Sequence, residues 1–209
     1  MSKGKIVCIG QNYREHIKEL KSEVPAEPVI FLKPTSSLIS DGEAILVPEG
    51  VGRVDHEVEL ALIIGRSGKN ISKDRAMGYI AALAVFDDVT ARDVQSAYRK
   101  AGLPWALSKG MDTFAPMSEP RPLAAAHDIH NLEIECRVNG TVRQHGSTSM
   151  MIYTPEELVA FISKWMTLEK GDIIATGTPS GVGPIGPGDL VEMRIEGVGT
   201  LTNPVRAKP

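Results

Sequence analysis

The sequence predicts a β-rich α+β fold, and two observations favour this over a doubly wound α/β sheet. Short apolar runs closed by Gly, Pro or Asn recur along the 209 residues, as is typical of strands joined by turns. Segments with helical spacing are few and scattered, so regular helical crossovers between strands are not expected. Strands are expected at 5–9, 29–32, 44–47, 54–65, 79–86, 132–138, 141–144, 172–175, 190–195 and 199–203.

The clearest helix is expected to begin after Thr154. Thr154 is a good N-cap, Pro155 suits the first helical position, and Glu157 completes a capping box. The apolar stripe of this helix is expected at Leu158, Phe161, Ile162 and Trp165.

Other local signals predict two further helices and one tight hairpin. Asn12 is expected to cap a helix over 12–20, and Thr90 is expected to cap another over 90–101. The pair Asn139-Gly140 lies between two alternating segments and predicts a two-residue β-turn.

Composition limits the class of protein. The chain is 42% hydrophobic and 23% charged with a net charge of −3, so no general basic field favours nucleic acid. Cys8 and Cys136 form no metal-binding pattern and are expected as buried free thiols, which fits a reducing compartment. The apolar runs are too short to span a bilayer, and the first residues lack the hydrophobic region of a signal peptide. We therefore expect one domain over 1–209, in the cytoplasm and away from membranes.

The strand over 54–65 organises the chain because its start carries two carboxylates. Glu57 and Glu59 lie two residues apart, so in an extended chain they project from the same face, about 6.6 Å apart at Cα. Like charges this close need a positive partner, and a divalent cation is the simplest one. The alternative is a frayed strand end with two solvated glutamates.

Asp88 is the third candidate ligand, since it follows the predicted strand over 79–86. Three carboxylates without a Cys or a His pair suit Mg²⁺ or Mn²⁺ and leave coordination positions for water or substrate. Spacing alone does not choose among the nearby acids, because Asp87, Asp93 and Asp112 remain rivals.

A His–carboxylate pair near the N-terminus is a candidate general base. His16 and Glu19 share one face of the predicted helix, and a carboxylate can orient the imidazole and stabilise its protonated form. The segment 21–28 is charged and carries two prolines, so residues 12–28 could form a mobile lid. The alternative is a charged, solvated helix.

Six stretches in order give a more specific hypothesis: I-G-Q-N-Y-R-E-H, F-L-K-P-T-S-S, D-H-E-V-E-L-A-L-I-I-G, D-V-T-A-R-D-V-Q, S-K-G-M-D-T-F-A-P and G-D-I-I-A-T-G-T-P-S-G-V-G. On these stretches the sequence resembles the fumarylacetoacetate hydrolase family from about residue 5 to about residue 205, in the short branch that includes acylpyruvate hydrolases. The resemblance implies the mixed β-sandwich roll of that family's C-terminal domain, with a few peripheral helices, and a homodimer.

The resemblance also implies roles for individual residues. Glu57, Glu59 and Asp88 match the metal ligands, and His16 with Glu19 matches the catalytic pair of the hydrolytic branch. Lys109 matches an active-site lysine that offsets negative charge. Residues that match the substrate-binding positions are Arg92, Gln95 and Thr178. Met150 stands where the family often has an acid, which leaves the contacts around it open, and Lys33 is expected to serve packing and hydrogen bonding.

The activity that the resemblance implies is metal-dependent hydrolysis of a carbon–carbon bond in a small anionic 2,4-dioxo acid, with decarboxylation of oxaloacetate as a related activity. Three alternatives stay open. The first is isomerisation or decarboxylation of 2-hydroxy-dienedioates, the second is keto–enol tautomerisation of oxaloacetate, and the third is a non-catalytic module that binds a metal or a small acid.

Overall fold

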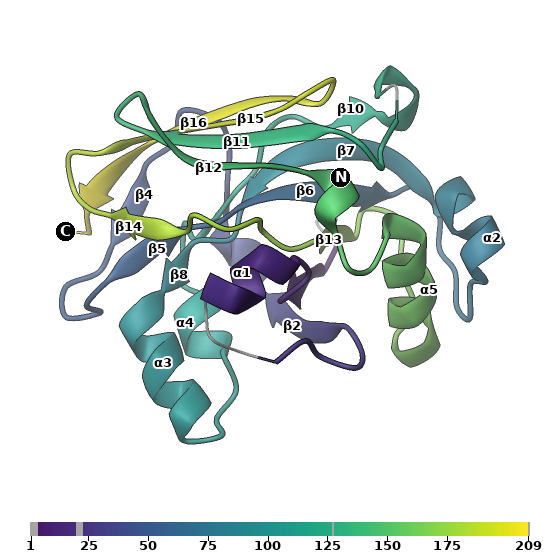
Figure 1. The fold of residues 1–209 in the computed structure, drawn as a ribbon, viewed down its shortest axis with the longest axis horizontal. Coiled ribbons are helices and arrows are strands. Elements are labelled where there is room, and N and C mark those ends of the chain that lie inside the picture. The colour runs from purple at the N-terminus through teal and green to yellow at the C-terminus, as the bar shows by residue number, and fades with distance from the viewer. Residues whose placement is uncertain (1–3, 20–22, 127, 209) are drawn as a thin grey trace.

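Two β-sheets packed face to face make up much of the chain in this computed structural model, which describes residues 4–19, 23–126 and 128–208 (Figure 1). The first sheet has the order β10 (Arg121–Pro122), β7 (Ile80–Asp87), β6 (Val58–Ile64), β13 (Ile173–Ala175), β1 (Ile6–Gly10) and β2 (Val29–Lys33). The second has the order β12 (Thr141–Ser147), β11 (Glu133–Val138), β15 (Leu190–Ile195), β16 (Gly199–Ala207) and β4 (Ile45–Val47). The pairs β1–β13 and β16–β4 are parallel and the others in these two sheets are antiparallel.

Smaller elements complete the described fold. A three-stranded sheet has the order β14 (Gly183–Ile185), β5 (Val54–His56) and β8 (Thr90–Ala91), and β3 (Leu38–Ile39) pairs in parallel with β9 (Ala115–Pro116). The helices α1 (Arg14–Glu19), α2 (Lys73–Ala76), α3 (Arg92–Lys100), α4 (Ala106–Lys109) and α5 (Pro155–Trp165) lie around the sheets (Figure 1). Short 3₁₀ turns occur at Thr35–Ser37, Met77–Tyr79, Leu123–Ala125 and Thr148–Met150. The prediction of a β-rich α+β fold is confirmed.

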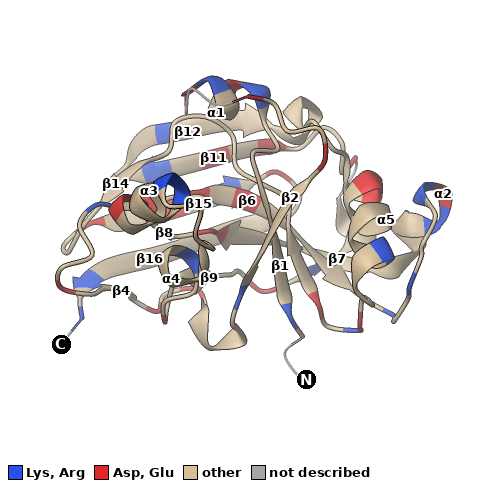
Figure 2. Ribbon diagram, turned by 90° about the horizontal axis from the view of Figure 1, so that it is seen from below, with Lys and Arg blue, Asp and Glu red and all other residues tan. Residues whose placement is uncertain are grey.

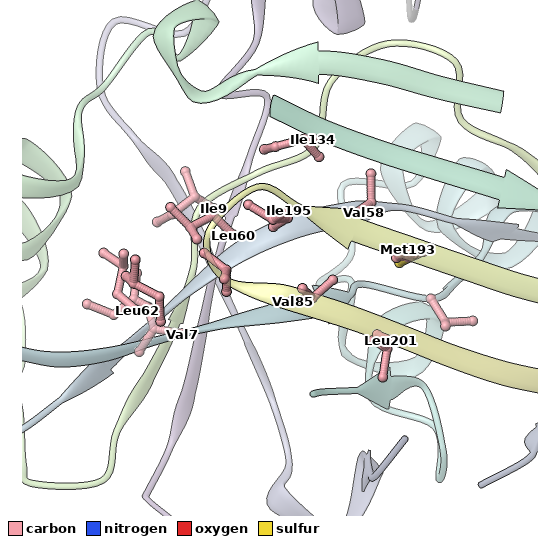
Figure 3. Packing of buried hydrophobic residues seen from close by; sticks show 14 of the residues in the cluster. Val7, Ile9, Val58, Leu60, Leu62, Val85, Ile134, Met193, Ile195 and Leu201 are labelled. Atoms are coloured by element: carbon pink, nitrogen blue, oxygen red, sulfur yellow. The ribbon is translucent and has the colours of Figure 1, made fainter. Parts of the chain in front are cut away.

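The main core lies between the two sheets. Leu60 and Leu62 of β6 and Val85 of β7 face Ile134 of β11 and Ile195 of β15 (Figure 3). Alternation places the other residues of β6 and β7 on the opposite face, where a smaller cluster contains Ala61, Ala84 and Phe86. The central strand β6 is thus buried on both sides, and a polar side chain at its end is held in a dry environment.

Several local predictions are confirmed. Asn139 and Gly140 form the two-residue turn between β11 and β12, with φ of 52° and 75° as a type I′ turn requires. The capping box at α5 is present, because the Thr154 backbone N–H donates to Glu157 Oε2 at 2.9 Å. Cys8 and Cys136 are buried free thiols, and burial raises the pKa of both.

Other local predictions are wrong, and each was overridden by tertiary contacts. Thr90 does not cap a helix, because it lies in β8 and α3 begins at Arg92. Trp165 is 68% exposed rather than part of the buried stripe of α5. Asn12 uses its amide to donate to Tyr153 O and Thr176 O, and so joins two loops instead of capping α1. The expected strand over 54–65 is interrupted at Glu57, which separates β5 from β6.

Charged residues of both signs are spread over the described ribbon (Figure 2). Helices in the described residues are too short and too polar to cross a membrane.

Candidate active site

Strand pairing brings the three predicted metal-binding carboxylates together. Glu57 precedes β6, Glu59 is its second residue, and Asp88 follows β7, the antiparallel neighbour of β6. The Asp88 backbone N–H donates to Glu57 O at 2.9 Å, which locks the two strand ends in register. One ligand oxygen from each carboxylate lies within 4.8 Å of the others, and all three residues are buried.

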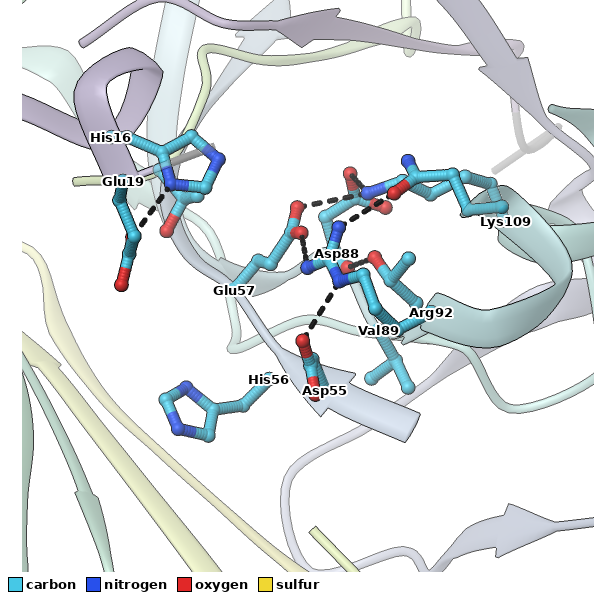
Figure 4. A network of polar contacts seen from close by, with 12 residues as sticks. His16, Glu19, Asp55, His56, Glu57, Asp88, Val89, Arg92 and Lys109 are labelled. Atoms are coloured by element: carbon cyan, nitrogen blue, oxygen red, sulfur yellow. Dashed lines mark hydrogen bonds and ion pairs between the residues drawn. The ribbon is translucent and has the colours of Figure 1, made fainter. Parts of the chain in front are cut away.

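Three cationic side chains contact two of these carboxylates, Glu57 and Asp88, and Figure 4 shows two of the three, Lys109 and Arg92. Lys109 Nζ donates to Glu57 Oε2 at 2.8 Å and to Asp88 Oδ2 at 2.5 Å. Lys33 Nζ donates to Asp88 Oδ1 and, at 3.0 Å, to Val89 O. Arg92 donates through Nη2 to Glu57 Oε1. Both oxygens of Glu57 and both oxygens of Asp88 therefore accept from a cation.

The surroundings shift the pKa of Glu57 and the pKa of Glu59 in opposite directions. Burial opposes ionisation of Glu57, but Lys109 and Arg92 outweigh it and hold the pKa of Glu57 well below its ordinary value. Burial, together with the neighbouring charges of Asp88 and Glu57, raises the pKa of Glu59 well above its ordinary value. Burial lowers the pKa of Lys109, yet Asp88 and Glu57 outweigh it and leave that pKa raised. Glu59 is thus the carboxylate whose charge is least well compensated.

The donor set fits a hard divalent cation. Glu59 Oε2 accepts a 2.8 Å hydrogen bond from Gly177 N, and no Lys or Arg of the described residues forms an ion pair with Glu59. A buried carboxylate without a cationic partner is costly, and a metal ion supplies that partner. Because all three donors are carboxylate oxygens, Mg²⁺ or Mn²⁺ suits the site better than a metal that prefers sulfur or imidazole.

A small cavity of about 40 Å³ adjoins the carboxylates. Its lining includes Phe31, Gln95, Trp105, Lys109 and Thr178. Lys109 Nζ also lies 5.0 Å from the centre of the Phe31 ring, which places an aromatic face against the ammonium. The cavity therefore combines positive charge, hydrogen-bonding groups and aromatic walls at the mouth of the buried strands.

The His16–Glu19 pair lies at the other side of the same cavity, on α1 (Figure 4). His16 is buried, and its Nδ1 lies 3.1 Å from Glu19 Oε2. This hydrogen bond outweighs burial, which alone would raise the pKa of Glu19, and that pKa lies below its ordinary value. Since an ionised Glu19 is acceptor-only, Nδ1 carries the hydrogen and Nε2 of neutral His16 is left as the basic nitrogen.

The turn after β13 contacts both sides of the cavity. Gly177 N donates to Glu59, and Gly181 N lies 3.3 Å from both carboxylate oxygens of Glu19. Gly177 has φ of 97°, and a Cβ there would lie 2.7 Å from Asn12 Cβ, so this position requires glycine. Thr178, between these contacts, is buried and lines the cavity.

The comparisons with known proteins agree with this geometry. Residues 5–206 match the family described as fumarylacetoacetate (FAA) hydrolase C-terminal. The chain belongs to the fumarylacetoacetate hydrolase family. An oxaloacetate tautomerase, FAHD1, of Arabidopsis thaliana is 46% identical over 207 residues, which cover 98% of this chain and 93% of that protein.

Solved structures in this family include two that bear on the site. Fumarylpyruvate hydrolase from Pseudomonas aeruginosa, in complex with Mn²⁺ and pyruvate, superposes with a TM-score of 0.95 at 29% identity, covering 99% of this chain and 91% of that one. The 5-carboxymethyl-2-hydroxymuconate delta-isomerase from Mycobacterium smegmatis gives 0.88 at 42% identity, covering 99% and 80%.

The geometry separates Asp88 from its three rivals in this family member. Asp87 Oδ1 accepts from Glu57 N at 2.8 Å, and burial raises the pKa of Asp87 to about 7. Asp93 accepts from Arg53 N at 2.9 Å. Asp112 has a side chain that is 65% exposed and lies 3.6 Å from Lys208. None of the three contributes to the cluster formed by Glu57, Glu59 and Asp88.

The expected substrate-binding residues all line the cavity, but Arg92 is already engaged. Its Nε donates to Asp55 at 2.8 Å and its Nη1 to Gln95 Oε1 at 2.6 Å, in addition to the contact with Glu57. Arg92 therefore supports Glu57, a candidate metal ligand, as well as facing the cavity. Lys109 lies at the end of α4.

Sequence reasoning gave too little weight to three buried polar residues. Lys33 was expected to serve packing and hydrogen bonding, and its ammonium donates directly to Asp88, a candidate metal ligand. The available signal was a lysine that ends an apolar strand, because such a charge is buried only when paired. His56 and Gln144 are fully buried, and burial lowers the pKa of His56 despite the hydrogen bond that His56 donates to Gln144 Oε1. No sequence pattern indicated that these two residues would meet, since β5 and β12 lie far apart in the chain.

Proposed function

We propose that this protein is a metal-dependent enzyme that cleaves the carbon–carbon bond of a small, doubly anionic 2,4-dioxo acid of the acylpyruvate type. The observation that supports this most strongly is the placement of a His–Glu pair and a buried lysine around one cavity beside three carboxylates. A general base and a site for a developing negative charge are the two requirements of such a hydrolysis.

Charge balance favours a dianion over a monoanion. The three carboxylates, Lys109 and a divalent ion alone sum to zero, which leaves no positive charge for an anionic substrate. With Lys33 and Arg92 included, the three cationic side chains cancel the three ionised carboxylates. A divalent ion then leaves two positive charges, which a substrate with two carboxylates neutralises.

In the proposed reaction, the divalent ion would polarise the 2-oxo group and help to hold the adjacent carboxylate. Thr178 would donate a hydrogen bond to that carboxylate. His16, oriented by Glu19, would take a proton from water, and the resulting hydroxide would attack the C4 carbonyl carbon. When the C3–C4 bond breaks, its electron pair moves to C3 and gives the enolate of pyruvate and a carboxylic acid. Lys109 would offset the enolate charge, and protonation at C3 by His16 would give pyruvate.

A second candidate is proton transfer at C3 of oxaloacetate, with or without loss of carbon dioxide. The 46% identical tautomerase supports it. Oxaloacetate is a dianion, and its tautomerisation and decarboxylation pass through an enolate at the same position. This candidate uses Lys109 and the metal but does not require an attacking water.

The remaining alternatives are an isomerase of 2-hydroxy-dienedioates, which the 42% identical isomerase structure keeps open, and a binding module without turnover. Purified protein with Mn²⁺ or Mg²⁺ should be assayed against fumarylpyruvate, oxaloacetate and a hydroxymuconate. Hydrolysis of fumarylpyruvate as the fastest reaction supports the proposal. Turnover of oxaloacetate alone would favour the tautomerase or decarboxylase, and turnover of hydroxymuconate alone would favour the isomerase. Binding without any turnover would favour the non-catalytic binding module. We also propose a cytoplasmic homodimer, to be tested by light scattering and by fractionation.

A further inference from the structure

A buried chain of three polar side chains leads from β5 to the cavity. His56 ends β5, Gln144 lies on β12 of the second sheet, and Thr178 follows β13. None of the three is more than 3% exposed. The mechanism above uses only Thr178, so the reason for burying the other two is open.

Backbone contacts fix which way the Gln144 amide points. The Val58 N–H donates to Gln144 Oε1 at 3.1 Å, and Gln144 Nε2 donates to Pro179 O at 2.8 Å. A backbone N–H can only donate and a carbonyl can only accept, so the oxygen and nitrogen of this amide cannot be exchanged.

This orientation determines the role of the Thr178 hydroxyl. Gln144 Nε2 also donates to Thr178 Oγ1, at 2.7 Å, so the hydroxyl oxygen accepts. Within residues 4–19, 23–126 and 128–208, the structure gives this hydroxyl no other hydrogen-bond partner. Its own hydrogen is therefore left for a group in the cavity, which Thr178 lines together with Lys109 and Glu57.

His56 helps to fix the orientation of the Gln144 amide. Its Nδ1 lies 2.9 Å from Gln144 Oε1, and because that oxygen can only accept, Nδ1 carries the hydrogen. Gln144 thus makes four hydrogen bonds, two through its oxygen and two through its nitrogen. A side chain with all its hydrogen-bonding capacity used has one orientation, and it cannot turn to accept from Thr178.

We propose that Gln144, held by His56, is a positioning residue that makes Thr178 an obligatory hydrogen-bond donor toward the substrate carboxylate. This inference rests on the proposed function, since it takes the ligand of Thr178 to be a carboxylate of an oxo acid. It adds a selection rule to the site: the group opposite Thr178 must accept a hydrogen bond. An oxo acid satisfies the rule through its carboxylate.

The test is calorimetric titration of pyruvate into the Mn²⁺-loaded protein. Thr178→Val removes the donor and should weaken pyruvate binding about 10- to 100-fold, as expected for a lost hydrogen bond to a charged group. Gln144→Glu should weaken it by a similar factor, because the new carboxylate accepts the Thr178 hydrogen and turns it away from the cavity. The double variant should bind no more weakly than Thr178→Val alone, and Thr178→Ser should bind nearly as well as the wild type.

Two results would overturn the inference: Gln144→Glu binding pyruvate within twofold of the wild type, or a double variant in which the two losses multiply. Mn²⁺ affinity should be unchanged throughout, since Gln144 contacts no metal-binding carboxylate, and a loss of Mn²⁺ affinity in Gln144→Glu would also count against it. If the Mn²⁺-loaded wild type does not bind pyruvate, the proposed function itself fails, which is a different outcome.

Variants at His56 keep the test open if Gln144→Glu does not fold. His56→Leu removes the donor to Gln144 Oε1, whereas His56→Asn retains an N–H at the equivalent position. Pyruvate binding should weaken several-fold in His56→Leu and return toward the wild-type value in His56→Asn. Equal affinities in all three proteins would show that His56 does not act through this chain.

Discussion

The two sides of the cavity are built differently. The carboxylates of the proposed metal-binding side come from β6 and the ends of β5 and β7, in the centre of the sheets, and every charge there except that of Glu59 has a cationic partner. The His16–Glu19 pair lies on a six-residue helix, and the Glu19 side chain is 35% exposed, compared with 2% for Asp88. The proposed metal-binding carboxylates are therefore held in the core, while the proposed proton-transfer group lies on a small helix near the surface.

This difference predicts two kinds of variant. Changes on the metal-binding side should affect metal affinity and every reaction together, because the enolate is common to them. Changes on the α1 side should impair proton transfer and leave metal affinity unchanged. The predictions below run from the largest expected effect to the smallest.

Glu57→Gln should have the largest effect. It removes a ligand and leaves Lys109 and Arg92 each without one of their carboxylate partners. We expect Mn²⁺ affinity and turnover of both fumarylpyruvate and oxaloacetate to fall by more than about a hundredfold, beyond the effect of an outer-shell change. Calorimetry and steady-state kinetics measure this, and full activity in a chelator would contradict it.

His16→Ala should impair hydrolysis without weakening Mn²⁺ binding. Loss of the base should lower kcat for fumarylpyruvate hydrolysis by about 10²- to 10⁴-fold, because proton abstraction from water is lost. Mn²⁺ affinity should stay within twofold, since His16 is not among the three converging carboxylates. Hydrolysis that survives within a few-fold would show that His16 is not the base.

Lys33→Met should have an intermediate effect on the metal. It removes the donor to Asp88 Oδ1 and leaves Lys109 as that carboxylate's remaining cationic contact in the described structure. We expect Mn²⁺ affinity to fall by about 10- to 100-fold. Lys73→Met is the matched control, because Lys73 pairs with Glu157 at the surface, and its Mn²⁺ affinity should be unchanged.

Replacing His130, which is not among the residues that line the cavity, should have the smallest effect, and that effect is on stability. Burial alone would lower the pKa of His130, but the carboxylates of Glu156 and Asp128 outweigh it and raise that pKa. A raised pKa means that the contact stabilises the fold fully below about pH 6.5 and loses this contribution as the pH rises through the folded-state value. The partly exposed pair should contribute less than about 1 kcal/mol.

The measurement for this contact is the difference in melting temperature between the wild type and His130→Ala. The difference should be larger at pH 5.5 than at pH 8.5, while Mn²⁺ affinity stays the same at each pH. A difference that grows as the pH rises would show that the sign is wrong.

The extent to which the sequence predicts this protein depends on the range of each interaction. The capping box at Thr154 and the turn at Asn139-Gly140 are local and were predicted correctly. Glu57 and Glu59 were singled out because they lie two residues apart just before an apolar run. Spacing did not separate Asp88 from Asp87, Asp93 and Asp112, and the family resemblance selected it. Trp165 and Thr90 were misplaced because packing and strand pairing overrode helical spacing. Lys33, His56 and Gln144 gain their roles from contacts 34 to 88 residues away in the chain, which no spacing rule reveals.

The central claim is that Glu57, Glu59 and Asp88 bind one divalent ion together. Its most direct test is calorimetric titration of Mn²⁺ into the metal-free wild type and into Glu59→Gln, which keeps the volume of the side chain and an acceptor for Gly177 N. We predict one Mn²⁺ per chain for the wild type and loss of that binding in Glu59→Gln. No Mn²⁺ binding to the wild type, or equal affinity in the two proteins, would contradict the account.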